Sequence, residues 1–153
     1  MDRADTNPLD SRTPKNMLIA EDDPNDRMVL ARIAKGLENR VRFHFVRDGD
    51  EVIDYLNGSE RFADRAVFPL PDLVLVDMHM PVLSGLETLQ WIRRDPRFSG
   101  LKVFAWSGSE SMSEFEAMRA AGADWVMPRP REYEELQALV RDFAERLWQP
   151  VSD

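Results

Sequence analysis

Short apolar runs alternate along the chain with longer stretches in which apolar residues recur every three or four positions. Runs of three or four apolar residues lie at 17–20, 73–76, 103–106 (followed by Ser107) and 125–127, and residues 41–46 alternate between apolar and polar side chains. A short continuous apolar run is typical of a strand that is covered on both faces, as in a parallel sheet. The alternation at 41–46 indicates an edge strand. Pro128 has no N–H to donate, so it favours a second edge at 125–127.

The stretches between these runs predict five amphipathic helices. Asp23 followed by Pro24 is typical of a helix start, and Ser84 with Glu87 has the spacing of a capping box. The apolar positions of these helices are Leu30, Ile33, Ala34 and Leu37; Val52, Ile53 and Leu56; Leu86, Leu89 and Ile92, which we expect to face inward; Met112, Phe115 and Met118, at a three-residue repeat; and Tyr133, Leu136, Leu139, Val140, Phe143 and Leu147. Strand and helix therefore alternate five times, which predicts a doubly wound α/β fold with right-handed crossovers.

The chain has the length of one domain, which we expect to span residues 16–149. Residues 1–15 carry few large apolar side chains, so we expect a flexible N-terminal tail, and residues 150–153 form a short C-terminal one. Residues 57–71 are longer than the other connections, and we expect a frayed helical extension followed by a loop.

Composition removes several classes of function. The formal net charge of −8 has the wrong sign for a nucleic-acid-binding surface. The 153 residues include no cysteine, which excludes disulfides, thiolate metal sites and cysteine nucleophiles. No apolar stretch approaches the roughly 20 residues of a membrane-spanning helix, and the N-terminus lacks the pattern of a signal peptide. The sequence therefore predicts a cytoplasmic protein that binds neither nucleic acid nor membrane.

Polar side chains stand at the ends of four predicted strands. Glu21 and Asp22, Asp77 and Ser107 each follow a buried strand, and Arg129 follows the predicted edge strand. Ligands of open α/β sheets bind beyond the carboxyl ends of the strands, so we expect these five side chains to converge. Carboxylates gathered in one pocket repel one another unless a cation is present, and hard oxygen ligands suit Mg²⁺. A hydroxyl and a guanidinium nearby could hold phosphoryl oxygens, and an ionised aspartate can attack phosphorus.

Each of these residues also has a structural interpretation. Glu21 and Asp22 could simply interact with the N-terminal dipole of the helix that follows them. Arg129 could be a surface cation on a loop, and Ser107 could do no more than end its strand. Of the two histidines, we expect His79 to face solvent from a loop and His44 to face water from its strand. The four tryptophans are expected to pack in the core or at an interface: Trp91, Trp106, Trp125 and Trp148.

Taken together, a set of motifs resembles the receiver domain of two-component response regulators, over about residues 16–147. The motifs are, in chain order, Ile19-Ala20-Glu21-Asp22-Asp23, Asp48-Gly49, Val76-Asp77-Met78-His79-Met80-Pro81 followed by Gly85, Ser107-Gly108, Gly122-Ala123-Asp124 and Arg129-Pro130. The resemblance implies a flavodoxin-like (βα)5 receiver fold with the parallel strand order 2-1-3-4-5. The connection before Pro71 and the lack of an output domain are similar to small phytochrome-associated receivers.

The resemblance also implies a role for each candidate residue. Asp77 would be the phosphoacceptor. Asp22 and Asp77, with Glu21 as the other member of the acidic pair, would hold Mg²⁺ together with the backbone carbonyl of His79. Ser107 would be the hydroxyl that follows the phosphoryl group on activation.

Two positions depart from the family pattern. The family has lysine where this chain has Arg129, and a planar, bidentate guanidinium does not replace a compact ammonium without consequence. The family's aromatic residue on the fifth strand falls on Val126, with Trp125 one place earlier.

These observations leave three functions open. The first is a stand-alone receiver, not an enzyme in its own right, that accepts a phosphoryl group from a histidine kinase and signals through altered protein contacts; a phytochrome-type kinase is one candidate donor. The second is a pseudo-receiver-like binding module that phosphorylation does not switch because of Arg129. The third is a phosphatase of the haloacid-dehalogenase type, which is disfavoured because such enzymes need an acid at the position of His79.

The resemblance further implies a contact face for partners and for a homodimer. It would be built from the helix at 111–121, the edge strand at 125–127 and the terminal helix that starts near Tyr133. The apolar candidates at or near this face are Met112, Phe115, Trp125 and Trp148.

Overall fold

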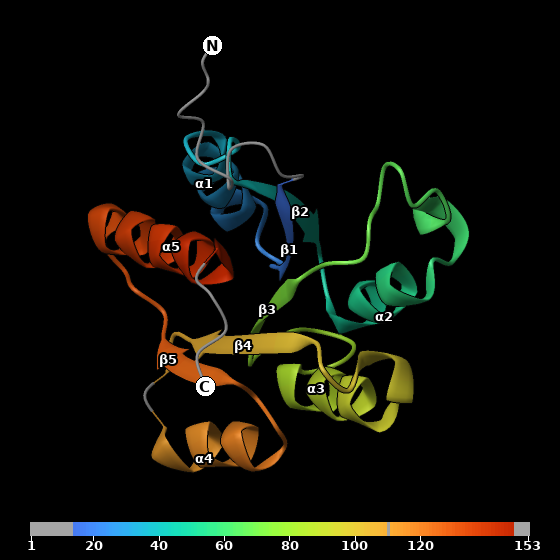
Figure 1. The fold of residues 1–153 in the computed structure, drawn as a ribbon. Helices are drawn as coiled ribbons and strands as arrows, with labels where there is room; N and C mark the ends of the chain where they lie inside the picture. The colour runs from blue at the N-terminus through green and yellow to red at the C-terminus, as the bar shows by residue number, and fades with distance from the viewer. Residues whose placement is uncertain (1–13, 110, 149–153) are drawn as a thin grey trace.

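Five parallel strands form one sheet in the computed structural model, which describes residues 14–109 and 111–148. The order β2-β1-β3-β4-β5 confirms the predicted doubly wound topology (Figure 1). The strands are β1 (Lys15–Ala20), β2 (Val41–Val46), β3 (Leu73–Asp77), β4 (Lys102–Ser107) and β5 (Trp125–Pro128). The predicted edge strands are the two outer ones, and Pro128 lies at the very end of β5.

The predicted tails fall largely outside the described residues, since both 1–13 and 149–153 do. Lys15 is an exception, because it belongs to β1 and not to a tail. It pairs with Val41 in the register of β1 and β2, and its N–H donates to the carbonyl of Arg40 at 3.2 Å. The sequence missed this because a lysine at the first position of a strand breaks the apolar run.

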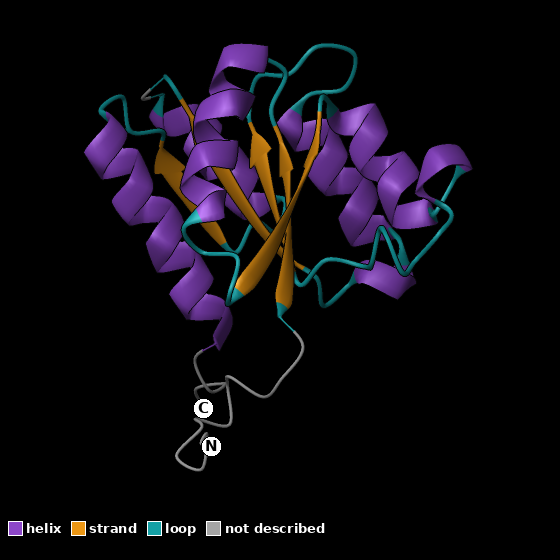
Figure 2. Ribbon diagram, turned by 90° about the horizontal axis from the view of Figure 1, so that it is seen from above, coloured by secondary structure: helices purple, strands orange, loops and turns teal. Residues whose placement is uncertain are grey.

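Helices cover both faces of the sheet (Figures 1 and 2). α1 (Pro24–Lys35) and α5 (Tyr133–Trp148) lie on one face, and α2 (Gly49–Asn57), α3 (Gly85–Arg94) and α4 (Met112–Ala120) lie on the other. Two 3₁₀ turns, η1 (Glu60–Phe62) and η2 (Pro96–Phe98), follow α2 and α3. None of the helices in the described part of the chain combines the length and the apolar character that crossing a membrane requires.

The strands supply side chains to two separate cores. In β3, Leu73 and Leu75 point to the α1–α5 face, and Val74 and Val76 point to the α2–α4 face. All four are at most 1% exposed, as expected for strands covered on both sides. The largest buried side chain, Trp106 of β4, belongs to the α1–α5 core.

The predicted helix starts are confirmed. The carboxylate of Asp23 accepts from the N–H of Asn25 at 2.8 Å, directly before α1. Ser84 and Glu87 form the capping box of α3, with reciprocal distances of 3.0 and 3.1 Å. These caps fix the two loops that leave β1 and β3.

The connection between α2 and β3 is more ordered than expected. The guanidinium of Arg65 donates to the carbonyls of Tyr55 and Leu56 at the end of α2, and to that of Phe68. The hydroxyl of Tyr55 donates to the carbonyl of Pro69 at 2.9 Å. Tyr55 is 1% exposed and was absent from the predicted stripe of α2, whereas the predicted Ile53 is only partly buried.

Two of the four apolar candidates for a contact face are wrong. Phe115 is 5% exposed and packs in the α2–α4 core. Trp148 is 9% exposed, and its indole N–H donates to the carbonyl of Arg40 at 2.8 Å, so its side chain packs within its own domain and is not available to a partner. Met112 is 61% exposed, and Trp125 is partly buried.

His44 also differs from the expectation, because its side chain does not simply face water. It is partly buried, and its Nε2 lies 3.2 Å from Oδ1 of Asn16 on β1.

Gly85 brings the start of α3 against the end of β3. A Cβ atom at this position would lie 2.5 Å from the carbonyl oxygen of Asp77 and 2.8 Å from Cα of Met78. Both are backbone atoms, which cannot rotate away as a side chain could. The absence of a side chain at Gly85 therefore sets how closely the loop after Asp77 is held.

We expect Gly85→Ala to lower the free energy of unfolding by about 1–3 kcal/mol, the usual cost of overpacking. Chemical denaturation monitored by circular dichroism measures it. Gly100→Ala is the matched control, since a Cβ there meets nothing within 4 Å. Equal stability of the two variants would contradict the close approach at Gly85.

Candidate functional site

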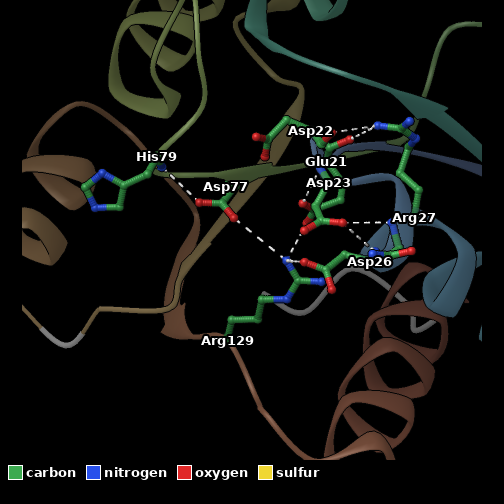
Figure 3. Close-up of polar contacts among 9 residues, drawn as sticks. Glu21, Asp22, Asp23, Asp26, Arg27, Asp77, His79 and Arg129 are labelled. Carbon is green, nitrogen blue, oxygen red and sulfur yellow. Dashed lines mark hydrogen bonds and ion pairs between the residues drawn. The ribbon is translucent and has the colours of Figure 1, made fainter.

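The register of the sheet brings the predicted residues to one edge. Asp77, the last residue of β3, pairs with Trp106 of β4, and Ser107 pairs with Pro128 of β5. The N–H of Arg129 donates to the carbonyl of Ser107 at 2.7 Å, which carries β5 one residue beyond its last pair. Glu21 follows the end of β1 on the other side of β3. Residues far apart in sequence therefore meet at the carboxyl ends of the strands (Figure 3).

Arg129 points into the centre of this group. Its Nη1 donates to Oε1 of Glu21, lies 3.7 Å from Oδ2 of Asp26 and lies 3.8 Å from Oδ2 of Asp77. Only 13% of its side chain is exposed. The guanidinium carbon lies 4.9 Å from the centre of the Trp106 ring. Arg129 is therefore a site residue and not a surface cation.

Glu21 is the most deeply buried acid of the group. Its residue is 2% exposed, and its second oxygen, Oε2, accepts from the N–H of Asp23 at 3.1 Å. Burial raises the pKa of Glu21 above its ordinary value, and the charge of Arg129 opposes this rise. Both carboxylate oxygens are thus occupied by the protein itself.

Asp77 is held from one side and open on the other. Its Oδ1 accepts from the N–H of His79 at 2.9 Å, and 14% of its side chain is exposed. Burial raises the pKa of Asp77, the His79 N–H and Arg129 lower it, and the negative charge of Asp22 raises it further. The carboxylates of Asp22 and Asp77 therefore interact across the edge of the sheet.

Two carboxylates of this site fit a divalent cation. Asp22 is exposed, and the guanidinium of Arg27 anchors its turn by donating to the carbonyls of Glu21 at 2.7 Å and Asp22 at 3.1 Å. Among the described residues, no three acidic or histidine side chains are arranged to share a metal ion. Mg²⁺ is commonly held by only one or two carboxylates, with water and phosphate oxygens completing its shell. Asp22 and Asp77 match that requirement, whereas Glu21 is bonded to Arg129.

Ser107 and His79 are the remaining predicted residues. Ser107 is fully buried, and its Oγ accepts from the N–H of Ser109 at 3.0 Å. The His79 side chain is 58% exposed and points away from the acids toward α4, where Nε2 lies 3.1 Å from Oε1 of Glu114 (Figure 3). The observed contact of His79 with the site is the one that its backbone N–H makes with Asp77.

A cavity of about 500 Å³ opens beside Asp77. It lies between α1 and the start of α5, and its lining includes Asp26, Arg129, Arg131 and Tyr133, together with apolar side chains of both helices. The site is therefore reachable from the α1–α5 side.

Sequence reasoning missed three residues that touch the site: Asp26, Arg27 and Trp106. Asp26 and Arg27 stand in the first turn of α1, just after the Asp23 cap, and that turn must lie at the same edge as Glu21. Trp106 directly precedes Ser107. Neighbouring strand residues face opposite sides, so its ring points to the α1–α5 face.

Val126 is 5% exposed in the α2–α4 core, whereas its neighbour Trp125 faces the α1–α5 core. The aromatic side chain of β5 is therefore on the opposite face from α4.

The parallel 2-1-3-4-5 sheet with an acidic carboxyl edge defines a receiver-type α/β protein. The chain matches the family model of the response regulator receiver domain over residues 17–141, and it belongs to that family.

Named relatives and solved structures agree with this assignment. The chain is 26% identical over 137 residues to a probable methanogenesis regulatory protein, FilR2, of Methanothrix harundinacea, covering 90% of this chain and 86% of that protein. It spans only 14% and 52% of the length of two further curated relatives, so it matches one part of those proteins.

Among solved structures, it is similar to a response regulator in red light signalling of R. palustris, with a TM-score of 0.80, 29% identity, and coverage of 91% of this chain and 96% of that one. The fold is also shared with the phosphorylated cyanobacterial phytochrome response regulator RcpA, with a TM-score of 0.81, 21% identity, and coverage of 92% and 98%.

We expect Asp77→Asn to raise the free energy of unfolding at pH 7 in the absence of divalent cations, because burial disfavours the charged carboxylate. A carboxyl whose pKa is raised in the folded state makes folding less favourable as the pH rises through that pKa. The gain should therefore be full above the raised pKa and should vanish as the pH falls to the ordinary value of 3.8.

Urea unfolding from pH 3 to pH 8 in the presence of a chelator measures this difference. Glu116→Gln, at an exposed position of α4, is the control and should show no comparable gain. A destabilised Asp77→Asn variant at pH 7 would contradict the argument.

Proposed function

We propose that Asp77 accepts a phosphoryl group from the phosphohistidine of a sensor histidine kinase, in a reaction that requires Mg²⁺, and that the product signals through altered protein contacts. The observation that carries this proposal is the placement of Asp77. Its carboxylate lies partly open at the edge of the sheet, 3.8 Å from the guanidinium of Arg129 and within the field of Asp22.

The transfer balances without any further reactant. A carboxylate oxygen of Asp77 forms the new O–P bond as the N–P bond of the phosphohistidine breaks. The electron pair of that bond stays on the imidazole nitrogen, which takes a proton from solvent. Asp22, Asp77 and the carbonyl of His79 would hold Mg²⁺, which neutralises charge on the phosphoryl oxygens when it is bound.

Three groups of this chain serve the transferred phosphoryl group. Arg129 has a guanidinium near Asp77 and can donate to phosphoryl oxygens. The Oγ of Ser107 accepts from the N–H of Ser109, and a hydroxyl that accepts one hydrogen bond can also donate one, here to a phosphoryl oxygen. Glu21 is proposed to keep Arg129 at the site between reactions, with its negative charge adjoining the metal ligands.

The contacts of Arg129 also support a second candidate, a binding module that phosphorylation does not switch. Arg129 is bonded to Glu21 and lies near Asp26, so it has anionic partners even without a phosphoryl group. If Arg129 keeps its contacts with these carboxylates instead of binding the phosphoryl oxygens, phosphorylation leaves the arrangement of the site unchanged. The two candidates differ in whether the site responds to a phosphoryl mimic.

The partner and the setting are part of the proposal. A phytochrome-type kinase is supported by the likeness to the red-light response regulator of R. palustris. We place the reaction in the cytoplasm, and the protein acts there as a signalling component and not as an enzyme with its own substrate. The proposed contact face for partners, or for a second copy of the chain, comprises α4, β5 and α5, where Met112 and Tyr133 are exposed.

We expect Asp77→Ala to abolish labelling by a radiolabelled phosphohistidine donor or by acetyl phosphate, because it removes the carboxylate whose oxygen would form the bond to phosphorus. The carboxylate of Asp26, which is 46% exposed and 3.7 Å from Arg129, stands on α1 and is still present in this variant. Phosphate-affinity electrophoresis measures the modified fraction. Asp64→Asn, in the α2–β3 connection at the other end of the sheet, should be labelled like the unmodified protein. Full labelling of Asp77→Ala would remove Asp77 from this role.

Beryllofluoride with Mg²⁺ separates the two candidates. We expect the tryptophan fluorescence to change on its addition, because Trp106 lies against Arg129, and the sedimentation coefficient to rise if the α4–β5–α5 face pairs two copies. The Asp77→Ala variant is the control and should show neither change. A protein that is labelled at Asp77 but gives no response supports the binding module.

A further inference from the structure

We propose that Trp106 is a positioning residue, which holds the guanidinium of Arg129 over its indole ring so that Arg129 stays within reach of Asp77. This inference rests on the proposed function only in so far as its kinetic test uses phosphorylation of Asp77. Its structural test needs no phosphorylation at all.

The first observation is the place of the indole ring. Trp106 pairs with Asp77 in the β3–β4 register, and it is completely buried. The guanidinium carbon of Arg129 lies over the ring, 4.9 Å from its centre. A guanidinium at this distance from an indole face is attracted by the ring's quadrupole, and tryptophan gives the strongest such attraction.

The second observation is that burying the indole of Trp106 costs free energy, because its N–H is left unpaired. Within the described part of the chain, the Nε1 of Trp106 has no hydrogen-bond partner. An unpaired buried donor destabilises a protein, and leucine or phenylalanine would fill much of this volume without it. Packing alone therefore does not favour tryptophan here. The contact between its ring face and Arg129 gives a reason for a tryptophan at this position.

The third observation is that Arg129 could otherwise leave. Three carboxylates, those of Glu21, Asp26 and Asp77, surround its Nη1, and the cavity of about 500 Å³ adjoins its side chain. Electrostatic attraction alone would let the guanidinium of Arg129 sit near any of the three acids or turn into the cavity. A ring beneath the guanidinium limits it to positions above that ring, which include those near Glu21 and Asp77.

The test compares two substitutions at Trp106. Trp106→Phe keeps an aromatic face and Trp106→Leu does not. We expect Trp106→Leu to slow phosphorylation of Asp77 by about 5- to 30-fold, the factor that corresponds to a partly desolvated cation–π contact. Trp106→Phe should recover most of the rate. In the Arg129→Lys background, where no planar group rests on the ring, the same two substitutions should differ by less than about threefold.

A spectroscopic measurement tests the contact directly. The Nε–H resonance of Arg129, assigned by its loss in Arg129→Lys, should be shifted upfield by the ring current in the unmodified protein and in Trp106→Phe. It should return to the ordinary arginine position in Trp106→Leu. Circular dichroism confirms that each variant is folded.

Trp91→Leu is the matched control. Trp91 lies on α3, on the opposite side of the sheet from Arg129, and packs against Phe98 with the ring centres 6.1 Å apart. This substitution should leave both the Arg129 resonance and the phosphorylation rate unchanged.

Equal slowing by Trp106→Phe and Trp106→Leu would assign Trp106 to packing alone and overturn the proposal. The proposal is also overturned if Trp106→Leu slows phosphorylation equally with and without the Arg129→Lys substitution. It is overturned as well if the chemical shift of the Arg129 Nε–H is the same in the unmodified protein and in Trp106→Leu. If the unmodified protein is not phosphorylated at all, the proposed function fails, and the resonance still decides whether Trp106 positions Arg129.

Discussion

One guanidinium lies among three carboxylates at the carboxyl edge of this sheet, and the arrangement of the site depends on it. Arg129 neutralises Glu21, which is buried and would otherwise be an uncompensated charge. The same nitrogen lies 3.8 Å from Asp77, so the acid that we propose as phosphoacceptor experiences a positive field while one side of it stays open. Without Arg129, the acids that follow β1 and β3 would repel one another across a partly dry edge.

The layers of the fold explain how such a charged group is accommodated. The α1–α5 core brings Trp106 beneath Arg129, and the first turn of α1 brings Asp26 beside it. The α2–α4 core instead supports the loop after Asp77, which Gly85 allows to pack against the backbone of α3. The α1–α5 face thus positions Arg129, and the α2–α4 face positions the loop after Asp77. The register of β3 and β4 brings these two parts of the site together.

Periodicity was sufficient to predict the strands, the helices and the convergence of Glu21, Asp77 and Arg129, because the carboxyl ends of parallel strands must meet at one edge. The strand order came only from the family resemblance, since no local pattern encodes which strands are neighbours. The contacts of Arg129 with Trp106 and Asp26 could not be predicted, because they depend on side-chain packing across β4 and α1. Trp148 was within reach, because it continues the four-residue spacing of Leu136, Val140 and Ala144 into the core.

The connection from Asn57 to Pro71 enters β3 at its amino end, whereas Asp77 stands at its carboxyl end. Arg65 and Tyr55 bond this connection to the last turn of α2, and none of its residues is among those that line the candidate site around Asp77. Changes in the length of a surface connection cost little chain entropy. The far end of the molecule can therefore change in length and acquire new recognition surfaces without altering the arrangement of side chains around Asp77.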